Sequence, residues 1–224
     1  MLTLSPDGGS EKEAMPIFTK ESLRVLFIHI PKTGGSSVEK IFERRGWKSD
    51  LIDKGSIVEP VSTNHLRKCS PQHMHGELLR ANLRLDRFDY VFTVVRNPIQ
   101  RFSSEYAFRK SKDLSISNSQ DAEEWWQMQK HTLRSDPYSL DNHLRPQHEF
   151  PISGTEVFRL EEGLERVARK IADLDSSTNA QLSEETEYPA VNKSWNSDTP
   201  VEISEKLKRE LRSFYRKDFK KFGY

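Results

Sequence analysis

The stretch from Leu23 to Phe42, LRVLFIHIPKTGGSSVEKIF, constrains the fold more than any other part of the chain. It opens with a nearly continuous apolar run, Val25 to Ile30, which is typical of a strand buried on both faces. Pro31 ends this run, and two adjacent glycines follow. Apolar residues then recur at helical spacing. The stretch therefore predicts a buried strand, a tight turn and a helix.

The glycine turn has the composition of an anion-binding site. Gly34 and Gly35 lack a Cβ, so the backbone there can turn tightly and approach a ligand closely. The first N–H groups of the following helix have no partner within it, and the helix dipole adds partial positive charge. Lys32 supplies a mobile full charge. Hydroxyl donors flank the glycines at Thr33, Ser36 and Ser37.

This turn differs from the triphosphate-binding loop G-x-x-x-x-G-K-[ST]. Lys32 precedes the glycines, and Ile30 stands where the first glycine of that loop would be. Because no acidic, metal-holding strand accompanies the turn, we expect no magnesium–triphosphate site. An ordinary strand-to-helix turn with a surface lysine is the alternative. The density of glycine, serine and lysine within six residues disfavours it.

A second predicted strand, Asp89 to Val95, also ends at a cationic residue, Arg96. Asn97 and Pro98 then mark a helix start, as N-cap and first helical residue. A guanidinium in this position can bind a phosphate through two hydrogen bonds, and Ser104 can add a hydroxyl. A structural salt bridge for Arg96 is the alternative.

Alternation of strands and helices favours an α/β fold with a central, mostly parallel sheet flanked by helices. Ligands of such sheets bind beyond the carboxyl ends of the strands. Lys32 and Arg96 both follow such ends, so we expect them at one edge of the sheet. Periodicity predicts a further helix over 161–174, and Thr199-Pro200 predicts the start of the last helix.

Composition limits the domain organisation and the partners. The 224 residues suit a flexible tail at 1–20 and a single domain at 21–224. A net charge of +1 gives no field that attracts nucleic acid, so we expect no such partner. No apolar run approaches the ~20 residues of a membrane span, and no signal peptide is evident. Cys69 is the only cysteine, so no intrachain disulfide can form. Together, these features favour the cytoplasm, although a chain trimmed of a membrane anchor would show the same features.

PKTGGSS after a buried strand resembles the loop that binds the 5′-phosphosulfate of PAPS (3′-phosphoadenosine 5′-phosphosulfate) in sulfotransferases. The IPKTGG form is similar to the carbohydrate, family-2, Golgi-type branch, which includes heparan sulfate 2-O-sulfotransferase. Arg96, with Ser104 eight residues later, resembles the 3′-phosphate site of this family. The resemblance extends from Leu23 to Tyr224. It implies a P-loop-like, PAPS-dependent O-sulfotransferase that releases PAP, requires no metal and acts on a hydroxyl acceptor, by default a carbohydrate.

The resemblance also implies a general base within Gln72-His73-Met74-His75-Gly76. His75 matches the base of the family and His73 its accessory histidine, although Met74 replaces the glycine between them. A histidine suits this role because its pKa lies near neutrality. On an extended segment the two side chains point to opposite sides, so we expect different roles. A histidine that caps the next helix is the alternative, and the spacing of the histidines disfavours a metal site.

Two further segments complete the implied site. Lys193 and Ser194 resemble a late segment that returns to PAPS, and Lys32 to Ser37 would hold its 5′ end. The loop DNHLRPQHEF resembles the acceptor side of bacterial members, and a hydrogen-bonded connector is its alternative. Its predicted substrate-binding residues are His143, Arg145 and Gln147. Two alternative functions remain open, an ATP-dependent kinase and a non-catalytic nucleotide-binding protein. The oligomeric state also remains open.

Overall fold

The protein is described by a computed structural model over residues 17–50, 63–112, 116, 121–176 and 201–224. Its centre is a five-stranded mixed sheet in the order β3-β1-β2-β4-β5. The strands are β1 Ile17–Lys20, β2 Leu23–Ile28, β3 Lys48–Asp50, β4 Tyr90–Val95 and β5 Glu156–Arg159. β4 runs parallel to β2 and β5, whereas β1 runs antiparallel to β2 and β3. The α/β class is confirmed, and the sheet is mixed because β1 runs against the common direction of the other four strands.

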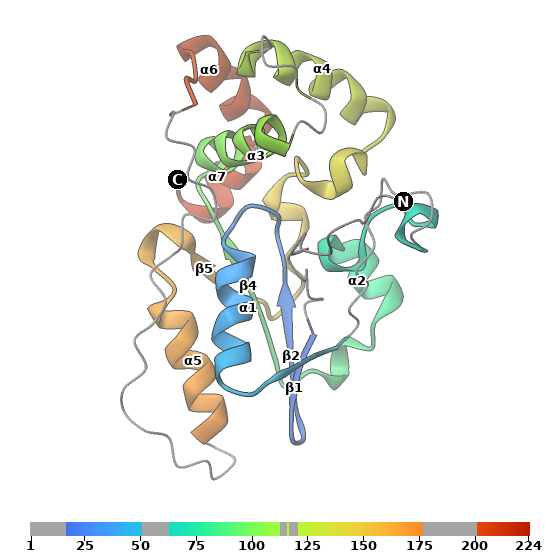
Figure 1. Cartoon of the computed structure of the whole chain (residues 1–224), viewed down its shortest axis with the longest axis vertical. Helices are drawn as coiled ribbons and strands as arrows, with labels where there is room; N and C mark the ends of the chain where they lie inside the picture. Colours follow the sequence, from blue (N-terminus) through green and yellow to red (C-terminus); the bar gives the residue numbers. More distant parts are fainter. Residues whose placement is uncertain (1–16, 51–62, 113–115, 117–120, 177–200) are drawn as a thin grey trace, which may run out of the picture.

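Helices cover both faces of this sheet and one of its ends (Figure 1). The α-helices are α1 Gly35–Arg44, α2 Gly76–Asn82, α3 Pro98–Lys112, α4 Ala122–Ser135, α5 Glu165–Ser176, α6 Glu205–Phe214 and α7 Arg216–Phe222. Short 3₁₀ turns lie at Thr63–Leu66, Pro71–His73, Leu85–Arg87, Ser139–Asn142, Gln147–Glu149 and Leu160–Glu162. We call α3, α4 and α6 the helical cap, which lies beyond the carboxyl end of β2 (Figure 1).

Alternation along β2 distributes its side chains between two cores. Val25 and Phe27 pack with α1 and α5, whereas Leu26 and Ile28 join α2 and α7 on the other face. All four side chains are at most 1% exposed, so the predicted strand buried on both faces is confirmed. A third core lies within the helical cap, where α4 buries Trp125 and Trp126 completely.

The strand β1 corrects the predicted tail boundary. Residues 17–20 pair with β2 and residues 17–19 also pair with β3, so the flexible tail predicted for 1–20 is wrong at its last four residues. The ring of Phe18 stacks on that of Phe42 at 3.8 Å between centroids. The four-residue strand IFTK is too short to give a clear periodicity, and antiparallel pairing supplies its order. Residues 1–16 lie outside the described part of the chain.

The last helix also starts later than predicted. α6 begins at Glu205, and the hydroxyl of Ser204 accepts a hydrogen bond from the N–H of Leu207 at 3.1 Å. A serine in this geometry is an ordinary N-cap and competes with the Thr199-Pro200 signal. That signal lies outside the described residues, while residues 201–204 are not helical.

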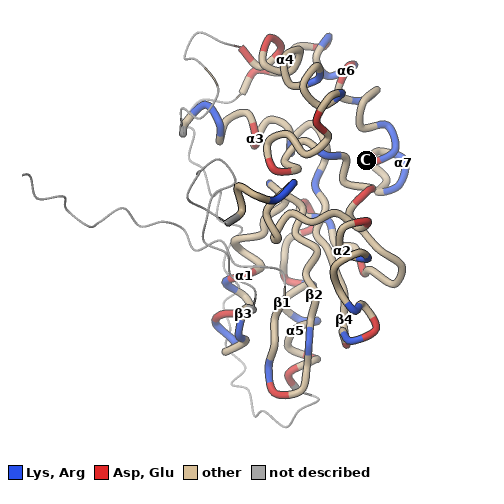
Figure 2. The backbone as a smooth tube through the Cα atoms, turned by 90° about the vertical axis from the view of Figure 1, so that its right-hand side faces the viewer, with Lys and Arg blue, Asp and Glu red and all other residues tan. Residues whose placement is uncertain are grey.

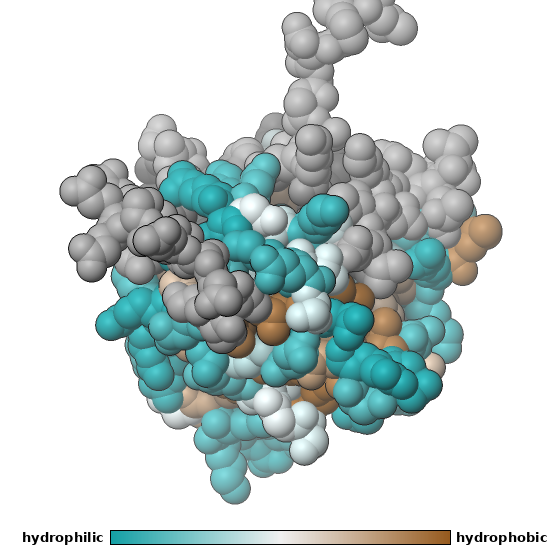
Figure 3. Space-filling view, turned by 90° about the horizontal axis from the view of Figure 1, so that it is seen from below, coloured by the Kyte–Doolittle hydropathy of each residue, from teal (hydrophilic) through white to brown (hydrophobic). Residues whose placement is uncertain are grey.

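Surface composition agrees with the small net charge. Figure 2 shows lysines and arginines interspersed with acidic residues over the described elements. The end opposite the helical cap is mostly hydrophilic, with smaller apolar areas between the hydrophilic residues (Figure 3). Among the described residues, no helix combines the length and apolarity that crossing a membrane requires.

Candidate active site

The turn between β2 and α1 combines two residues with positive φ. Lys32 has φ 67° and Gly34 has φ 92°. A left-handed backbone is unusual for lysine and costs roughly 1–2 kcal/mol, so the surrounding contacts must impose it. Thr33 is fully buried, and its hydroxyl donates to the carbonyl of Ile30 at 2.8 Å. The hydroxyl of Thr33 thus braces the turn, although we predicted a ligand contact.

The N-terminus of α1 begins with N–H groups that have no partner within the helix. Gly34 is its N-cap and, as a glycine, has no side chain that could cap the helix. Ser36 is exposed on the first turn of α1, whereas Ser37 is 7% exposed. At Gly35 an added Cβ would lie 2.0 Å from Nε2 of His29, so glycine is required for this close packing. The turn therefore presents backbone N–H groups with Lys32 beside them, as the sequence predicts.

Arg96 lies against this same turn. Its Nη1 donates to the backbone carbonyl of Lys32 at 3.4 Å. The side chain of Gln147 fixes the backbone of Arg96, because its Oε1 accepts from the N–H at 3.0 Å and its Nε2 donates to the carbonyl at 2.7 Å. The predicted position of Lys32 and Arg96 at one edge of the sheet is therefore confirmed.

A carboxylate that the sequence did not indicate, that of Glu161 in the 3₁₀ turn Leu160–Glu162, contacts the start of α3. Asn97 caps the helix as predicted, with its Oδ1 accepting from the N–H of Ile99 at 3.0 Å. Glu161 accepts from the N–H of Asn97 at 2.6 Å and from the hydroxyl of Tyr224 at 2.9 Å. Burial lowers the pKa of Arg96, and the Glu161 carboxylate opposes this shift. Ser104 is half-buried further along α3.

His73 is held by a carboxylate. Its Nδ1 lies 2.7 Å from Oδ2 of Asp141 and 3.2 Å from the hydroxyl of Ser70. Ser70 also donates to Asp141 through its N–H and its hydroxyl, both at 2.6 Å. Asp141 belongs to a run of three non-glycine residues with positive φ, which includes Leu140 and Asn142. Such strain clusters at functional sites.

Stability at acid pH is expected to depend on Asp141. Burial raises the pKa of its carboxyl, but the charge and hydrogen bond of His73 outweigh burial and lower the pKa from 3.8 to about 2. Because the folded-state pKa is the lower one, the carboxylate stabilises the fold above about pH 4, and this contribution is lost as the pH falls to about 2. Asp141→Asn should cost about 2 kcal/mol of unfolding free energy at neutral pH. Urea unfolding at several pH values measures this, and an unchanged acid dependence in the variant would contradict it.

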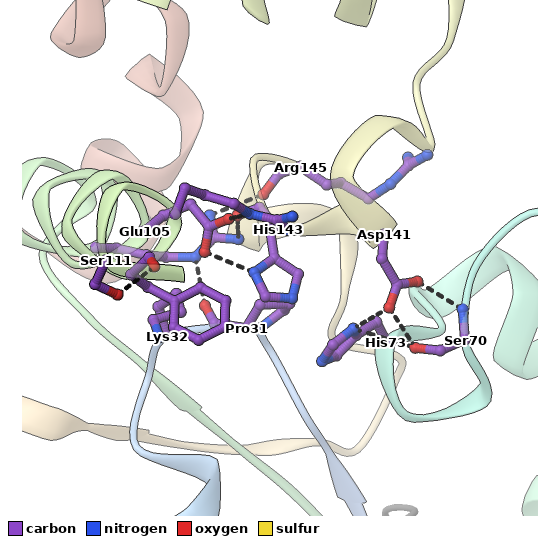
Figure 4. A network of polar contacts seen from close by, with 12 residues as sticks. Pro31, Lys32, Ser70, His73, Glu105, Ser111, Asp141, His143 and Arg145 are labelled. Carbon is purple, nitrogen blue, oxygen red and sulfur yellow. Dashed lines mark hydrogen bonds and ion pairs between the residues drawn. The ribbon is translucent and has the colours of Figure 1, made fainter. Parts of the chain in front are cut away.

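A second histidine–carboxylate pair faces the first. Nδ1 of His143 lies 2.6 Å from Glu105, whose other oxygen accepts from Nε of Arg109 at 2.6 Å. Burial raises the pKa of Glu105, but His143 and Arg109 outweigh it and hold the pKa well below its usual range. The rings of His73 and His143 are 4.8 Å apart, edge to face. Figure 4 shows His143 between Glu105 and His73.

Lys32 lies near the two histidine–carboxylate pairs, beside the ring of Phe108. Its Nζ lies 4.0 Å above the ring of Phe108, which stacks near His143 at 6.3 Å between centroids. The pKa of His29, behind the turn, is lowered well below its usual value, first by burial and then by the charge of His73. His143 and Lys32 lower it further. These side chains therefore gather around one place at the edge of the sheet.

His75 occupies different surroundings. It is the N-cap residue of α2, its side chain is 5% exposed, and its ring lies 5.8 Å from that of Tyr138. Its Nε2 is 3.7 Å from a carboxylate oxygen of Glu77, which is 82% exposed. Burial lowers the pKa of His75, and the charge of Arg145 adds to this effect. The two histidines of the motif thus have different neighbours, as their spacing predicts.

Two residues predicted to face the acceptor are used within the fold. Arg145 donates to Asn142 at 2.7 Å and to Glu149 at 2.5 Å, while Gln147 is fully buried against Arg96. Their side chains therefore act as internal supports, and only His143 of the three reaches the group around Lys32. Substrate binding by Arg145 and Gln147 stays a prediction, and their internal hydrogen bonds favour the connector alternative. Lys193 and Ser194 lie outside the described residues.

Arg101 is a support that sequence reasoning left unresolved. It is 2% exposed and donates to the carbonyls of Pro31 at 2.9 Å, Arg145 at 2.9 Å and His143 at 2.6 Å. One guanidinium thus ties α3 both to the Lys32 turn and to the loop that carries His143. An arginine on the first turns of a helix gives no sequence signal that separates such a clamp from a solvated side chain.

One group among the described residues has the composition of a metal site. His73, Asp141 and His143 each bring a ligand atom within 4.8 Å of the others. Two of them already form a hydrogen-bonded pair, and His143 is paired with Glu105. The expectation of a reaction without metal stays a prediction, which a chelator tests below.

Comparison with known proteins agrees with this geometry. A model of the Sulfotransferase family matches residues 15–224, which is nearly the whole chain. The α/β sheet flanked by helices is consistent with a sulfotransferase fold, and the chain belongs to the sulfotransferase family. Searches of curated proteins and of solved structures gave no significant match. Family membership supports sulfuryl transfer to an acceptor as the general activity.

Proposed function

We propose that this protein transfers the sulfuryl group of PAPS to a hydroxyl of a carbohydrate, through the residues gathered beyond β2 and β4. The observation that carries the proposal is the contact of 3.4 Å between Nη1 of Arg96 and the carbonyl of Lys32. It joins two cationic strand ends into one rim that a molecule with two separate phosphates can span. The IPKTGG and H-x-H motifs favour the branch similar to heparan sulfate 2-O-sulfotransferase.

The residues present fit the two ends of PAPS. At one end, the N–H groups from Gly34 to Ser37 begin a helix whose N-cap is a glycine, which suits a 5′-phosphate. Of these, the N–H of Ser37 also donates to the carbonyl of Gly34 at 3.0 Å. At the other end, Arg96 offers a planar guanidinium and Ser104 a hydroxyl for the 3′-phosphate. Arg96 is partly desolvated, which strengthens its attraction to an anion. PAPS supplies the activated sulfuryl group when it is bound.

Lys32 has the electrostatic role in this proposal. As the bond between sulfur and the phosphate oxygen breaks, negative charge develops on that oxygen. An ammonium placed beside the turn stabilises this charge more in the transition state than in the ground state, and therefore accelerates the reaction. The strained backbone of Lys32, with φ 67°, fixes the origin of its side chain. In-line transfer then needs only an acceptor oxygen on the opposite side of sulfur.

We assign the general base to His73 in place of His75. The bond of 2.7 Å to Asp141 orients the ring and fixes its proton on Nδ1, so that Nε2 is the acceptor. His73 then takes the hydroxyl proton as the new bond between oxygen and sulfur forms, and Asp141 stabilises the resulting imidazolium. The carboxylate that lies nearest to His75 among the described residues is that of the exposed Glu77, 3.7 Å from its Nε2, and the ring of His75 faces that of Tyr138.

Transfer of labelled sulfate from PAPS to a panel of sugars tests the proposed activity. We expect product with PAPS and unchanged rates in EDTA. Product from labelled ATP that depends on Mg²⁺ would instead establish a kinase. Binding of nucleotide without turnover on any acceptor, with undiminished affinity in a His73→Ala variant, would favour a non-catalytic binding protein.

Arg96 is expected to decide selectivity for the 3′-phosphate. Arg96→Ala should weaken PAP binding ~100- to 10,000-fold, since a charge-assisted hydrogen bond contributes about 1.5–3 kcal/mol and a bidentate contact makes two. ADP, which lacks the 3′-phosphate, should lose much less affinity. Calorimetric titration of both nucleotides measures the ratio, and Arg87→Ala, at an exposed arginine, is the matched control. Equal losses for PAP and ADP would contradict a 3′-phosphate contact.

A further inference from the structure

A third parallel strand ends at the rim that carries Lys32 and Arg96. β5 pairs in parallel with β4, so the 3₁₀ turn Leu160–Glu162, which follows β5 directly, lies at the same edge of the sheet. A Cβ added at Gly34 would lie 2.8 Å from Cδ1 of Leu160. The turn after β5 therefore packs against the turn after β2 and borders the proposed PAPS site.

This third turn brings a carboxylate, that of Glu161, to the cationic rim. Its Oε1 accepts from the N–H of Asn97, the residue that follows Arg96, at 2.6 Å. Burial lowers the pKa of the Arg96 guanidinium, and the charge of Glu161 opposes this fall. The guanidinium itself donates to the carbonyl of Lys32, at 3.4 Å. A negative charge thus lies beside the cation on which the proposed binding of the 3′-phosphate depends.

A second contact holds this carboxylate in place. The Oε2 of Glu161 accepts from the hydroxyl of Tyr224 at 2.9 Å. Tyr224 is itself fixed, because its N–H donates to the carbonyl of Phe219 in α7 at 3.2 Å and the guanidinium of Arg159 lies 5.3 Å from the centre of its ring. Both oxygens of Glu161 are therefore engaged, and its charge stays at the start of α3.

A phosphate that binds Arg96 has to approach this negative charge, and like charges repel. Glu161 is exposed, so water screens its charge and the repulsion is moderate. PAPS and PAP carry the same 3′-phosphate, so the repulsion weakens the binding of both by the same factor. Such a uniform effect raises KM for the donor and speeds release of the product, and it leaves the chemical step unchanged.

We propose that Glu161 weakens the binding of the 3′-phosphate, and that it thereby sets the affinity for PAPS and the rate at which PAP leaves. The proposal rests on the proposed function and describes the regulation of that same site. Glu161 takes no part in sulfuryl transfer itself. Its effect comes from its charge, whereas its hydrogen bonds only fix where that charge lies.

Glu161→Gln tests this proposal, because it removes the charge and keeps the size and the hydrogen-bonding capacity of the side chain. Calorimetric titration should show PAP bound ~3- to 10-fold more tightly at low salt, with little change for ADP, which lacks the 3′-phosphate. Release of PAP, followed by rapid mixing, should slow by the same factor. The single-turnover rate at saturating PAPS should stay the same, which separates this effect from a change in the chemistry.

Two matched variants separate charge from structure. Glu161→Asp keeps the charge but is shorter, so it should disturb the hydrogen bonds to Asn97 and Tyr224 and bind PAP no more tightly than the unchanged protein. Glu162→Gln removes the charge of the next residue, whose side chain is 45% exposed and pairs with Arg166 at 3.0 Å, and should leave PAP affinity unaltered. The gain in Glu161→Gln should shrink at ~1 M salt, where the Debye length is about 3 Å.

The outcomes distinguish this proposal from the function on which it rests. Unchanged or weaker PAP binding in Glu161→Gln overturns the proposal, and so does an equal gain for PAP and ADP. Sulfuryl transfer stands in either case if labelled sulfate from PAPS reaches an acceptor. If the unchanged protein neither binds PAP nor transfers sulfate, the proposed function fails and this proposal fails with it.

Discussion

Lys32→Ala is expected to lower kcat for sulfuryl transfer about 100- to 1,000-fold, which is the usual effect of removing one preorganised charge from a transition state. The loss should fall mainly on kcat, because charge on the departing oxygen is greatest in the transition state. Affinity for PAP should change less, since the N–H groups of α1 and Arg96 remain. Single-turnover kinetics with PAPS, together with PAP titration, separate the two effects.

The backbone of Lys32 offers a control for folding. With φ 67°, this position suits glycine without strain, so Lys32→Gly should fold normally and be as inactive as Lys32→Ala. Lys40 is an exposed lysine on α1, and Lys40→Ala should keep full activity. Near-normal kcat in Lys32→Gly with unchanged PAP binding would contradict the proposed role of the ammonium.

His73→Ala is expected to lower kcat about 100- to 10,000-fold, the range for loss of a general base. His75→Ala should lower kcat less than 10-fold, because His75 packs against Tyr138 and lacks the carboxylate that orients His73. Asp141→Asn should fall between them, since the asparagine keeps the volume and loses the charge. Parallel steady-state assays on one good acceptor measure all three.

The pH profile distinguishes a base from a structural histidine. In the unchanged enzyme, kcat/KM should fall on the acid side as His73 becomes protonated. His73→Ala should lose this limb, and His75→Ala should retain it. A variant that has lost only stability would keep the shape of the profile. Full activity in His73→Ala, with activity abolished in His75→Ala, would return the base to His75.

Much of the fold could be predicted because its signals are local. The strand, turn and helix from Leu23 to Phe42 carry their own periodicity, and Asn97 caps α3 where expected. The strand β1 could not be found, since its four residues are too few to give a periodicity, and their order comes from pairing with β2 and β3 and from the packing of Phe18 on Phe42. The predicted start of α6 was wrong because Thr199 and Ser204 are both residue types that favour an N-cap, and the sequence does not rank them.

The candidate site likewise contains residues that the sequence could predict and residues that it could not. Lys32 and Arg96 follow strand ends, so the rule for ligands at the carboxyl edge of a sheet brought them together. The pairs formed by His73 with Asp141 and by His143 with Glu105 join residues 68 and 38 positions apart. No periodicity marks such partners. The sequence could predict that His73 and His75 point to opposite sides. It could not predict which of the two pairs with a carboxylate, because that depends on the loop that carries Asp141.

A crystal structure of the protein with PAP would test the central claim most directly. We predict one PAP molecule, with its 5′-phosphate against the N–H groups from Gly34 to Ser37 and its 3′-phosphate within hydrogen-bond distance of Arg96 and Ser104. Nζ of Lys32 should point to the 5′-phosphate, with His73 and His143 beyond it. A PAP molecule that touches only one of the two strand ends, or binds elsewhere on the protein, would contradict the account.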